Sequence, residues 1–158
     1  MNKTIFITGA AKRIGKQIAL TFKELGWNII IHYNSSKKAA DDLADEINNS
    51  NANSAVTVQG NLDVKEDVEK IISEVLDAFP SIDLLINNAS TFYPTPIDDI
   101  SEDHWEKLIG SNLKGPMFLI KGLKQKLKES NGSIINITDT NLSKGVANYS
   151  IYSAAKAG

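Results

Sequence analysis

The chain has 158 residues, of which 42% are hydrophobic and 23% are charged, and it contains no cysteine. That length suits one domain with a sizeable core, and the composition is ordinary for a globular protein. Without cysteine, the sequence excludes disulfides, thiolate catalysis and zinc–thiolate sites. A net charge of -2 gives no electrostatic reason to expect nucleic acid or an anionic membrane as a partner.

The chain shows no targeting or membrane segment. Its first residues lead directly into a strand-like run, which is unlike a signal peptide. No apolar stretch approaches the ~20 residues that a membrane-spanning helix needs. We therefore expect a cytoplasmic protein that makes no membrane contact.

Apolar residues alternate between short continuous runs, typical of strands buried on both faces, and stripes at helical spacing. In chain order the pattern predicts strand 4–7, helix 14–25, strand 27–33, helix 39–47, strand 55–59, helix 68–79, strand 82–86, helix 102–129, strand 132–138 and a helix from about 149.

This alternation predicts an α/β fold of the Rossmann type, with a doubly wound parallel sheet and helices on both faces. We expect residues 1–158 to form a single dinucleotide-binding domain of about five strands. The last predicted helix has only begun at Gly158, so we expect the domain to be incomplete at its C-terminus.

The first strand is followed by a glycine-containing turn that opens a helix. Gly9 allows a tight turn with close approach of the backbone to a pyrophosphate, and Gly15 allows close packing of helix on sheet. Free amides at the helix start favour such an anion. The motif predicts a cofactor site that includes Gly9, Lys12, Arg13, Ile14 and Gly15. Ordinary turns also use glycine, so the predicted strand–turn–helix context carries the argument.

The second strand ends without the acidic residue that commonly holds the adenosine ribose in NAD sites. Its end supplies the cofactor-site candidates His32, Tyr33, Asn34, Ser35 and Ser36. Without an acid a 2′-phosphate is not repelled, so we expect NADP(H) as the cofactor. The alternative is a polar turn in which Ser35 or Ser36 caps the next helix.

Tyr152 and Lys156 lie four residues apart, on one face of the last predicted helix. A free tyrosine titrates near ~10, and a neighbouring ammonium lowers that pKa. The pair therefore predicts a proton donor for a reduction, whereas the alternative is an ordinary surface pair of a helix.

Four motifs in this order resemble the short-chain dehydrogenase/reductase family: Thr8-Gly9 to Gly15, Asn87-Asn88-Ala89, Asn112 and the Tyr152/Lys156 pair. The resemblance implies that Tyr152 is the catalytic acid, that Lys156 tunes it, and that Asn112 supports Lys156 through a water. It also implies that Asn61, Leu62, Asn88, Ala89 and Ser90 line the cofactor groove.

Three departures from the general family resemble the pteridine reductases: Arg13, Ser90 and Asp139, which stands thirteen residues before Tyr152. The run Asn-Asn-Ala-Ser-Thr-Phe-Tyr-Pro-Thr-Pro at 87–96 is also similar to that branch. The resemblance implies NADPH-dependent reduction of a small pterin or folate.

In that interpretation Phe92 stacks on the pterin and Asp139 accepts hydrogen bonds from its ring edge. The implied substrate residues are Arg13, Ser90, Phe92, Asp139 and Tyr152. The alternatives are that Phe92 only packs its loop and that Asp139 only caps the turn after its strand.

The resemblance further implies a homo-oligomer, a tetramer in the family, formed through the helices at 102–129 and from about 150. His32 and His104 are far apart in the sequence, so we expect no metal site. Two other functions stay open: a carbonyl or 3-oxoacyl reductase of the same family, and a non-catalytic module that senses NADP(H).

Overall fold

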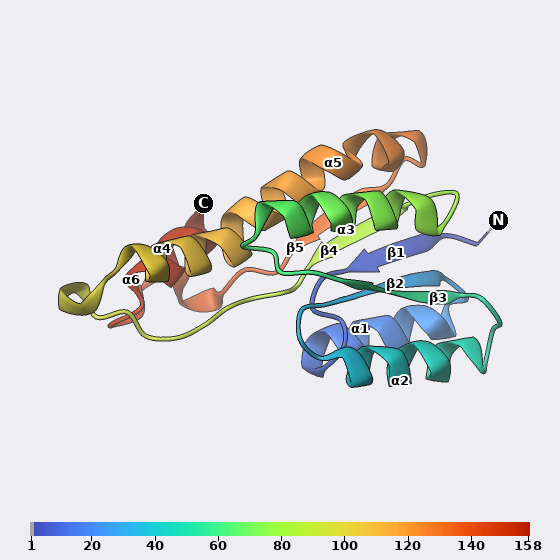
Figure 1. The fold of residues 1–158 in the computed structure, drawn as a ribbon, viewed down its shortest axis with the longest axis horizontal. Helices are drawn as coiled ribbons and strands as arrows, with labels where there is room; N and C mark the ends of the chain where they lie inside the picture. Colours follow the sequence, from blue (N-terminus) through green and yellow to red (C-terminus); the bar gives the residue numbers. More distant parts are fainter. Residues whose placement is uncertain (1) are drawn as a thin grey trace.

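A computed structural model describes residues 2–158, with the backbone alone for Leu142 and Ser143. Its centre is a five-stranded sheet in the order β3-β2-β1-β4-β5 (Figure 1), and all neighbouring strands are parallel. The strands are β1 (Thr4–Ile7), β2 (Asn28–Tyr33), β3 (Ala55–Gln59), β4 (Leu84–Asn87) and β5 (Ser133–Asn136). The predicted Rossmann-type α/β fold is confirmed.

Helices cover both faces of the sheet. Figure 1 shows α1 and α2 on one face, and α3 and α5 on the other. The helices are α1 (Arg13–Glu24), α2 (Lys37–Asn48), α3 (Lys65–Ala78), α4 (Glu102–Ile109), α5 (Gly115–Glu129) and α6 (Ser150–Ala157). Short 3-10 turns, η1 (Ile97–Asp99) and η3 (Thr140–Ser143), were not predicted.

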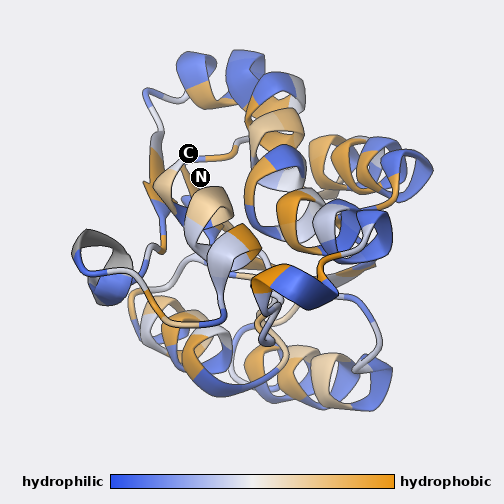
Figure 2. Cartoon of the chain, turned by 90° about the vertical axis from the view of Figure 1, so that its left-hand side faces the viewer, coloured by the Kyte–Doolittle hydropathy of each residue, from blue (hydrophilic) through white to orange (hydrophobic). Residues whose placement is uncertain are grey.

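The strands separate two apolar layers because their side chains alternate between the faces. Ile5 and Ile7 pack in the layer beneath α1 and α2, whereas Phe6 packs with Leu119 and Leu123 of α5. Figure 2 shows the matching pattern in the helices, which are hydrophobic on one side and hydrophilic on the other. Within the described residues, the structure has no helix long and apolar enough to cross a membrane.

The single helix predicted at 102–129 is wrong in one respect, because a π-helical turn, η2 (Gly110–Lys114), separates α4 from α5. Pro116 has no N–H, so the carbonyl four residues earlier loses its helical partner. Gly110 also lies directly against Asp63. The turn buries Asn112, which is only 8% exposed. Such turns are frequent at functional sites.

Strand β5 forms one edge of the sheet, and all four of its residues are exposed. On α5, the apolar side chains of Met117 and Phe118 are 60% and 45% exposed. Oligomer formation through this helix remains a prediction.

We expect Leu123→Ala to lower the free energy of unfolding by about 2–5 kcal/mol, because the substitution opens a cavity in the layer beneath α5. Leu123 is 0% exposed, whereas Leu25 at the end of α1 is 64% exposed. The control Leu25→Ala should stay within about 0.5 kcal/mol of the parent. Urea unfolding followed by circular dichroism measures both, and equal losses would contradict the assigned core.

Candidate functional site

The loop between β1 and α1 lies in close contact with the end of β4. Gly9 has a φ of 63°, and a Cβ there would lie 3.0 Å from Cα of Ala89. A Cβ on Gly15 would lie 2.7 Å from Nδ2 of Asn88. Only glycine fits at these two positions, which matches the roles predicted from the sequence.

Hydrogen bonds fix this contact. The hydroxyl oxygen of Thr8 accepts from the backbone N–H groups of Asn88 and Ala89, at 2.9 and 3.0 Å. In return, Nδ2 of Asn88 donates to the carbonyls of Thr8 and Gly9, at 2.8 and 3.2 Å. Asn88 was predicted to line the cofactor groove, and its amide also holds the loop in place.

A cavity of about 450 Å³ opens where the strands β1, β2, β3 and β4 end. It brings together most of the predicted cofactor residues: Gly9, Lys12, Arg13, Ile14, Gly15, His32, Asn34, Asn61, Leu62, Asn88, Ala89 and Ser90. Thr91 and Ser111 also line it, and the sequence analysis missed both. Both are next to predicted site residues, because Thr91 follows Ser90 and Ser111 precedes Asn112, and this adjacency could have identified them.

The cavity has the features that a dinucleotide phosphate needs. The first amides of α1 have no intrahelical partner, and the helix dipole adds positive potential there. The lining residues include two cations, Lys12 and Arg13, and no acid. The backbone passes close by at Gly9 and Gly15, where a side chain would not fit. These residues can therefore hold a pyrophosphate.

His32 lies at this cavity but is only 2% exposed. Its Nδ1 is 3.1 Å from the Gly9 N–H and its Nε2 is 3.0 Å from the Gly60 carbonyl. Burial lowers the pKa of His32 to about 4, although the bond to Gly60 acts in the opposite direction. Both ring nitrogens are thus bound to the protein, whereas the sequence analysis expected a cofactor ligand.

Three other residues at the end of β2 lie outside this cavity. Tyr33 is 8% exposed and packs in the apolar layer with α1 and α2. Ser35 and Ser36 line a neighbouring cavity together with Lys12. Ser36 precedes α2, but its side chain makes no capping hydrogen bond.

The two lysines at the start of α2 are already paired. Lys37 lies 2.6 Å from Asp41 and Lys38 lies 2.7 Å from Asp42. Since both are surface pairs one turn apart, each contributes little stability. Their charge is nevertheless partly neutralised, which leaves Lys12 as the other cation that lines the neighbouring cavity.

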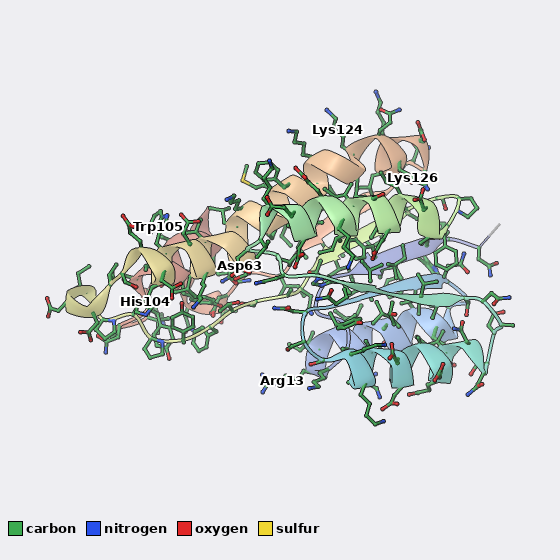
Figure 3. All side chains as sticks on the ribbon, viewed as in Figure 1. Arg13, Asp63, His104, Trp105, Lys124 and Lys126 are labelled. Atoms are coloured by element: carbon green, nitrogen blue, oxygen red, sulfur yellow. The ribbon has the colours of Figure 1, made fainter. Side chains whose placement is uncertain are left out.

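Arg13 adopts a left-handed backbone conformation with a φ of 51°. That conformation is unfavourable for a residue with a Cβ, and such strain is concentrated at functional sites. Figure 3 shows the Arg13 side chain projecting from the start of α1. The backbone at this position therefore favours glycine, whereas the side chain that is present adds a cation to the cavity lining.

Tyr152 and Asp139 are joined by a hydrogen bond. The Tyr152 hydroxyl donates to Oδ2 of Asp139 at 2.9 Å, while Oδ1 of Asp139 accepts from the Asn141 N–H at 2.8 Å. The carboxylate therefore caps the turn after β5, and it does more than cap because it also contacts the phenol. These hydrogen bonds lower the pKa of Asp139, and the bond from the Asn141 N–H has the largest effect. A hydrogen bond from a pterin to Asp139 stays a prediction.

The pKa of Tyr152 is raised, whereas the sequence predicted that it would be lowered. Burial raises it to about 12, and the hydrogen bond to Asp139 and its negative charge add to the effect. Lys156 does not contact the phenol, because its Nζ donates to the Ile137 carbonyl at 3.0 Å. Burial also lowers the pKa of Lys156. Tyr152 is therefore protonated at neutral pH.

The side chain of Asn112 makes its direct hydrogen bonds to the loop after β4 and to its own helix. Asn112 and Lys156 line one cavity, and support of Lys156 through a water stays a prediction. The Oδ1 of Asn112 accepts from the Ser90 hydroxyl at 2.7 Å. Its Nδ2 donates to the carbonyls of Thr91 and Leu108, at 2.9 and 3.0 Å. The amide thus connects the π-helical turn to the loop after β4, and it holds Ser90 beside the cavity.

An aromatic group surrounds the Tyr152 phenol. Phe92 is stacked on Tyr149, with ring centroids 4.5 Å apart and planes at 14°. The same ring meets Tyr152 edge to face at 4.7 Å. Phe92 thus packs on residues outside its own loop and remains 55% exposed, and its stacking on a pterin stays a prediction. The sequence analysis missed Tyr149, which directly precedes α6, although its place three residues before Tyr152 was a usable signal.

A metal site is not apparent in the part of the chain that the structure describes. No group of three or more His, Asp or Glu side chains is placed there to hold an ion. His104 instead packs edge to face against Tyr93.

The chain is similar to several characterised reductases. It is 35% identical over 159 residues to the 3-oxoacyl-(acyl-carrier-protein) reductase FabG of Staphylococcus epidermidis, covering all of this chain and 65% of that protein. It is 37% identical over 153 residues to the 3-oxoacyl-(acyl-carrier-protein) reductase of Synechocystis, covering 96% of this chain and 62% of that protein. It is 27% identical over 154 residues to the versicolorin reductase of Emericella nidulans, covering 98% and 58%.

The chain thus spans less than two thirds of the length of these relatives. The family model for short chain dehydrogenases matches residues 3–158, nearly the whole sequence. That match agrees with the parallel sheet, the glycine turn after β1 and the Tyr152/Lys156 pair on α6. The chain belongs to the short chain dehydrogenase family.

Proposed function

We propose that this protein is an NADP(H)-dependent reductase in which Tyr152 supplies the proton to the substrate. The observation that carries the proposal is the buried phenol, held by Asp139 beside the loop of Ser90. A bound nicotinamide supplies the hydride. Tyr152 is 6% exposed and carries the proton that an oxygen or nitrogen of the reduced bond takes up. Its raised pKa makes it a weaker acid than a free tyrosine, so the proton moves as the arriving hydride makes the substrate atom basic.

The chain's own residues divide the remaining work. Gly9, Gly15 and the first amides of α1 hold the pyrophosphate, and Lys12 with Ser35 and Ser36 receives the 2′-phosphate. Asn88 and Asn112 keep the surrounding loops in position. A module that only senses the cofactor has no need of the Tyr152–Asp139 pair, which argues against that alternative.

Two substrate classes are supported by different observations. The site favours a pterin, because a planar ring can stack on the exposed Phe92 and its N–H edge can donate to Asp139. The names of the relatives favour a 3-oxoacyl thioester, and on that comparison the second class is the better supported. Against it, a ketone has no N–H group for Asp139 to bind.

The first prediction separates these classes. In the longest form of the protein, NADPH oxidation is followed by absorbance with 7,8-dihydrobiopterin and with acetoacetyl-CoA. Tyr152→Phe should lower turnover about 10²–10⁴-fold with the preferred substrate, because the proton donor is lost. Asp139→Ser should lower pterin turnover and spare the thioester.

Tyr93→Phe is the matched control, since Tyr93 packs on His104. Turnover of acetoacetyl-CoA alone would replace the pterin assignment with the 3-oxoacyl one. NADPH binding without turnover of either substrate would leave the reductase proposal without support.

The second prediction concerns the 2′-phosphate. Lys12→Ala should weaken NADPH binding about 10- to 100-fold, because one charge-assisted contact is removed. NADH binding should weaken less, because NADH shares the pyrophosphate but has no 2′-phosphate. Lys38→Ala should have a smaller effect because Lys38 is already paired with Asp42. Fluorescence titration of the parent and both variants with each cofactor measures the affinities, and equal losses for NADPH and NADH in Lys12→Ala would contradict the assignment.

The third prediction follows from the strained backbone of Arg13. Arg13→Gly should raise the free energy of unfolding by about 1 kcal/mol, since glycine tolerates the left-handed conformation. It should also weaken NADPH binding, because a cation is lost from the cavity. Arg13→Lys keeps the strain and the charge, and should not gain stability. A destabilised Arg13→Gly protein in thermal unfolding would contradict the argument.

A further inference from the structure

His32 lies where the ends of three strands meet. It belongs to β2, its Nδ1 contacts the Gly9 N–H just after β1, and its Nε2 contacts the Gly60 carbonyl just after β3. Its own carbonyl accepts from the Ala10 N–H at 2.9 Å. Two consecutive amides of the loop after β1 are thus held by one residue.

The partners determine the tautomer of the ring. A backbone N–H can only donate, so Nδ1 must carry a lone pair toward Gly9. A carbonyl oxygen can only accept, so Nε2 must carry the proton that reaches Gly60. The ring is therefore neutral and protonated at Nε2 alone. Adding a proton at Nδ1 would set two donors against each other at 3.1 Å.

These hydrogen bonds determine which way the backbone N–H and carbonyl groups of the loop after β1 point relative to the cavity. The amide of Gly9 is turned toward His32, and the carbonyls of Thr8 and Gly9 are turned toward Asn88. With both sides of the loop held, the first amides of α1 remain directed at the space where a pyrophosphate fits. A loop already held in its binding conformation loses less entropy when the ligand arrives.

We propose that His32 is a positioning residue, which holds the loop after β1 in its cofactor-binding conformation through a neutral ring protonated at Nε2. The proposal rests on the dinucleotide site proposed above and assigns His32 no contact with the cofactor. In this proposal, the affinity for the cofactor depends on the hydrogen-bond acceptor at the Nδ1 position, because that atom binds the Gly9 N–H.

The surroundings keep the ring neutral. Lys12 and Arg13 line the cavity that His32 borders, and none of its described lining residues is an acid whose carboxylate would stabilise a charged ring. Phe6 meets the ring edge to face, and Tyr33 follows on the same strand. On α3, Asp67 lies beside Gly60 and accepts from the Asn61 N–H at 2.7 Å, so its carboxylate is engaged elsewhere. Burial lowers the pKa of His32 to about 4.

A neutral ring also makes stability depend on pH. In the unfolded chain the histidine takes its proton near 6.5, and in the folded chain only near 4. Protonation therefore favours unfolding, so this stability is complete above pH 6.5 and is lost as the pH falls toward 4. The folding equilibrium constant should fall by up to about 300-fold across that window.

Two variants separate the ring nitrogens. In His32→Asn the amide oxygen takes the place of Nδ1 and can still accept from Gly9, whereas in His32→Gln the amide nitrogen takes the place of Nε2 and serves Gly60 alone. Titration of NADPH by fluorescence at pH 7.5 should give near-parental affinity for His32→Asn. His32→Gln should bind about tenfold more weakly, the loss expected for one hydrogen bond.

Urea unfolding at the same pH shows whether each variant is folded, and repeating it at lower pH tests the linkage. Between pH 6.5 and 4 the parent should lose more stability than His32→Asn. The chain has only two histidines, so ¹⁵N imidazole spectra of the cofactor-free protein and of His104→Gln assign the His32 tautomer directly.

Each remaining outcome overturns a defined part of the proposal. Equal NADPH affinity of His32→Gln and the parent, or equal loss in His32→Asn and His32→Gln, would show that the Nδ1 acceptor does not position the loop. A ring protonated at Nδ1 would remove its basis. If the predicted tautomer is found but the parent binds no NADPH, the proposed cofactor site fails instead.

Discussion

The close backbone contact between the loop after β1 and the end of β4 is the constraint on which the candidate site depends. Parallel strands in register bring Ile7, Ile31 and Ile86 level, so the residues after them meet at one edge of the sheet. Glycine at position 9 and glycine at position 15 let the chains approach to van der Waals contact. The cavity exists because no side chain fills that space.

A second constraint is the pairing of a phenol with a carboxylate. Asp139 stabilises the protonated form of Tyr152, whereas an ammonium in contact would stabilise the phenolate. The phenol of Tyr152 therefore stays protonated at neutral pH in this structure. Phe92 and Tyr149 pack beside the same phenol, so aromatic rings border the pocket next to the carboxylate.

Much of the fold followed from local pattern. The central strands β1, β2 and β4 are buried on both faces, so their apolar runs stood out, and the helices carry regular stripes. The pattern missed the π-helical turn, because apolar spacing does not register the carbonyl that Pro116 leaves unpaired. It also placed Tyr33 in the cofactor site, although the strand alternation directs that side chain into the core.

By itself, the sequence determined the α/β fold, the order of the motifs and the residues that gather at the strand ends, since these depend on periodicity and on glycine at particular turns. Only the tertiary structure decided the partners of each polar group. His32 forms hydrogen bonds with Gly9 and Gly60, and Asn112 accepts one from Ser90. Lys156 donates to the Ile137 carbonyl and not to the Tyr152 phenol. Hydrogen-bond partners that are far apart in the chain are brought together by tertiary packing, so they cannot be predicted from residue spacing along one strand or helix.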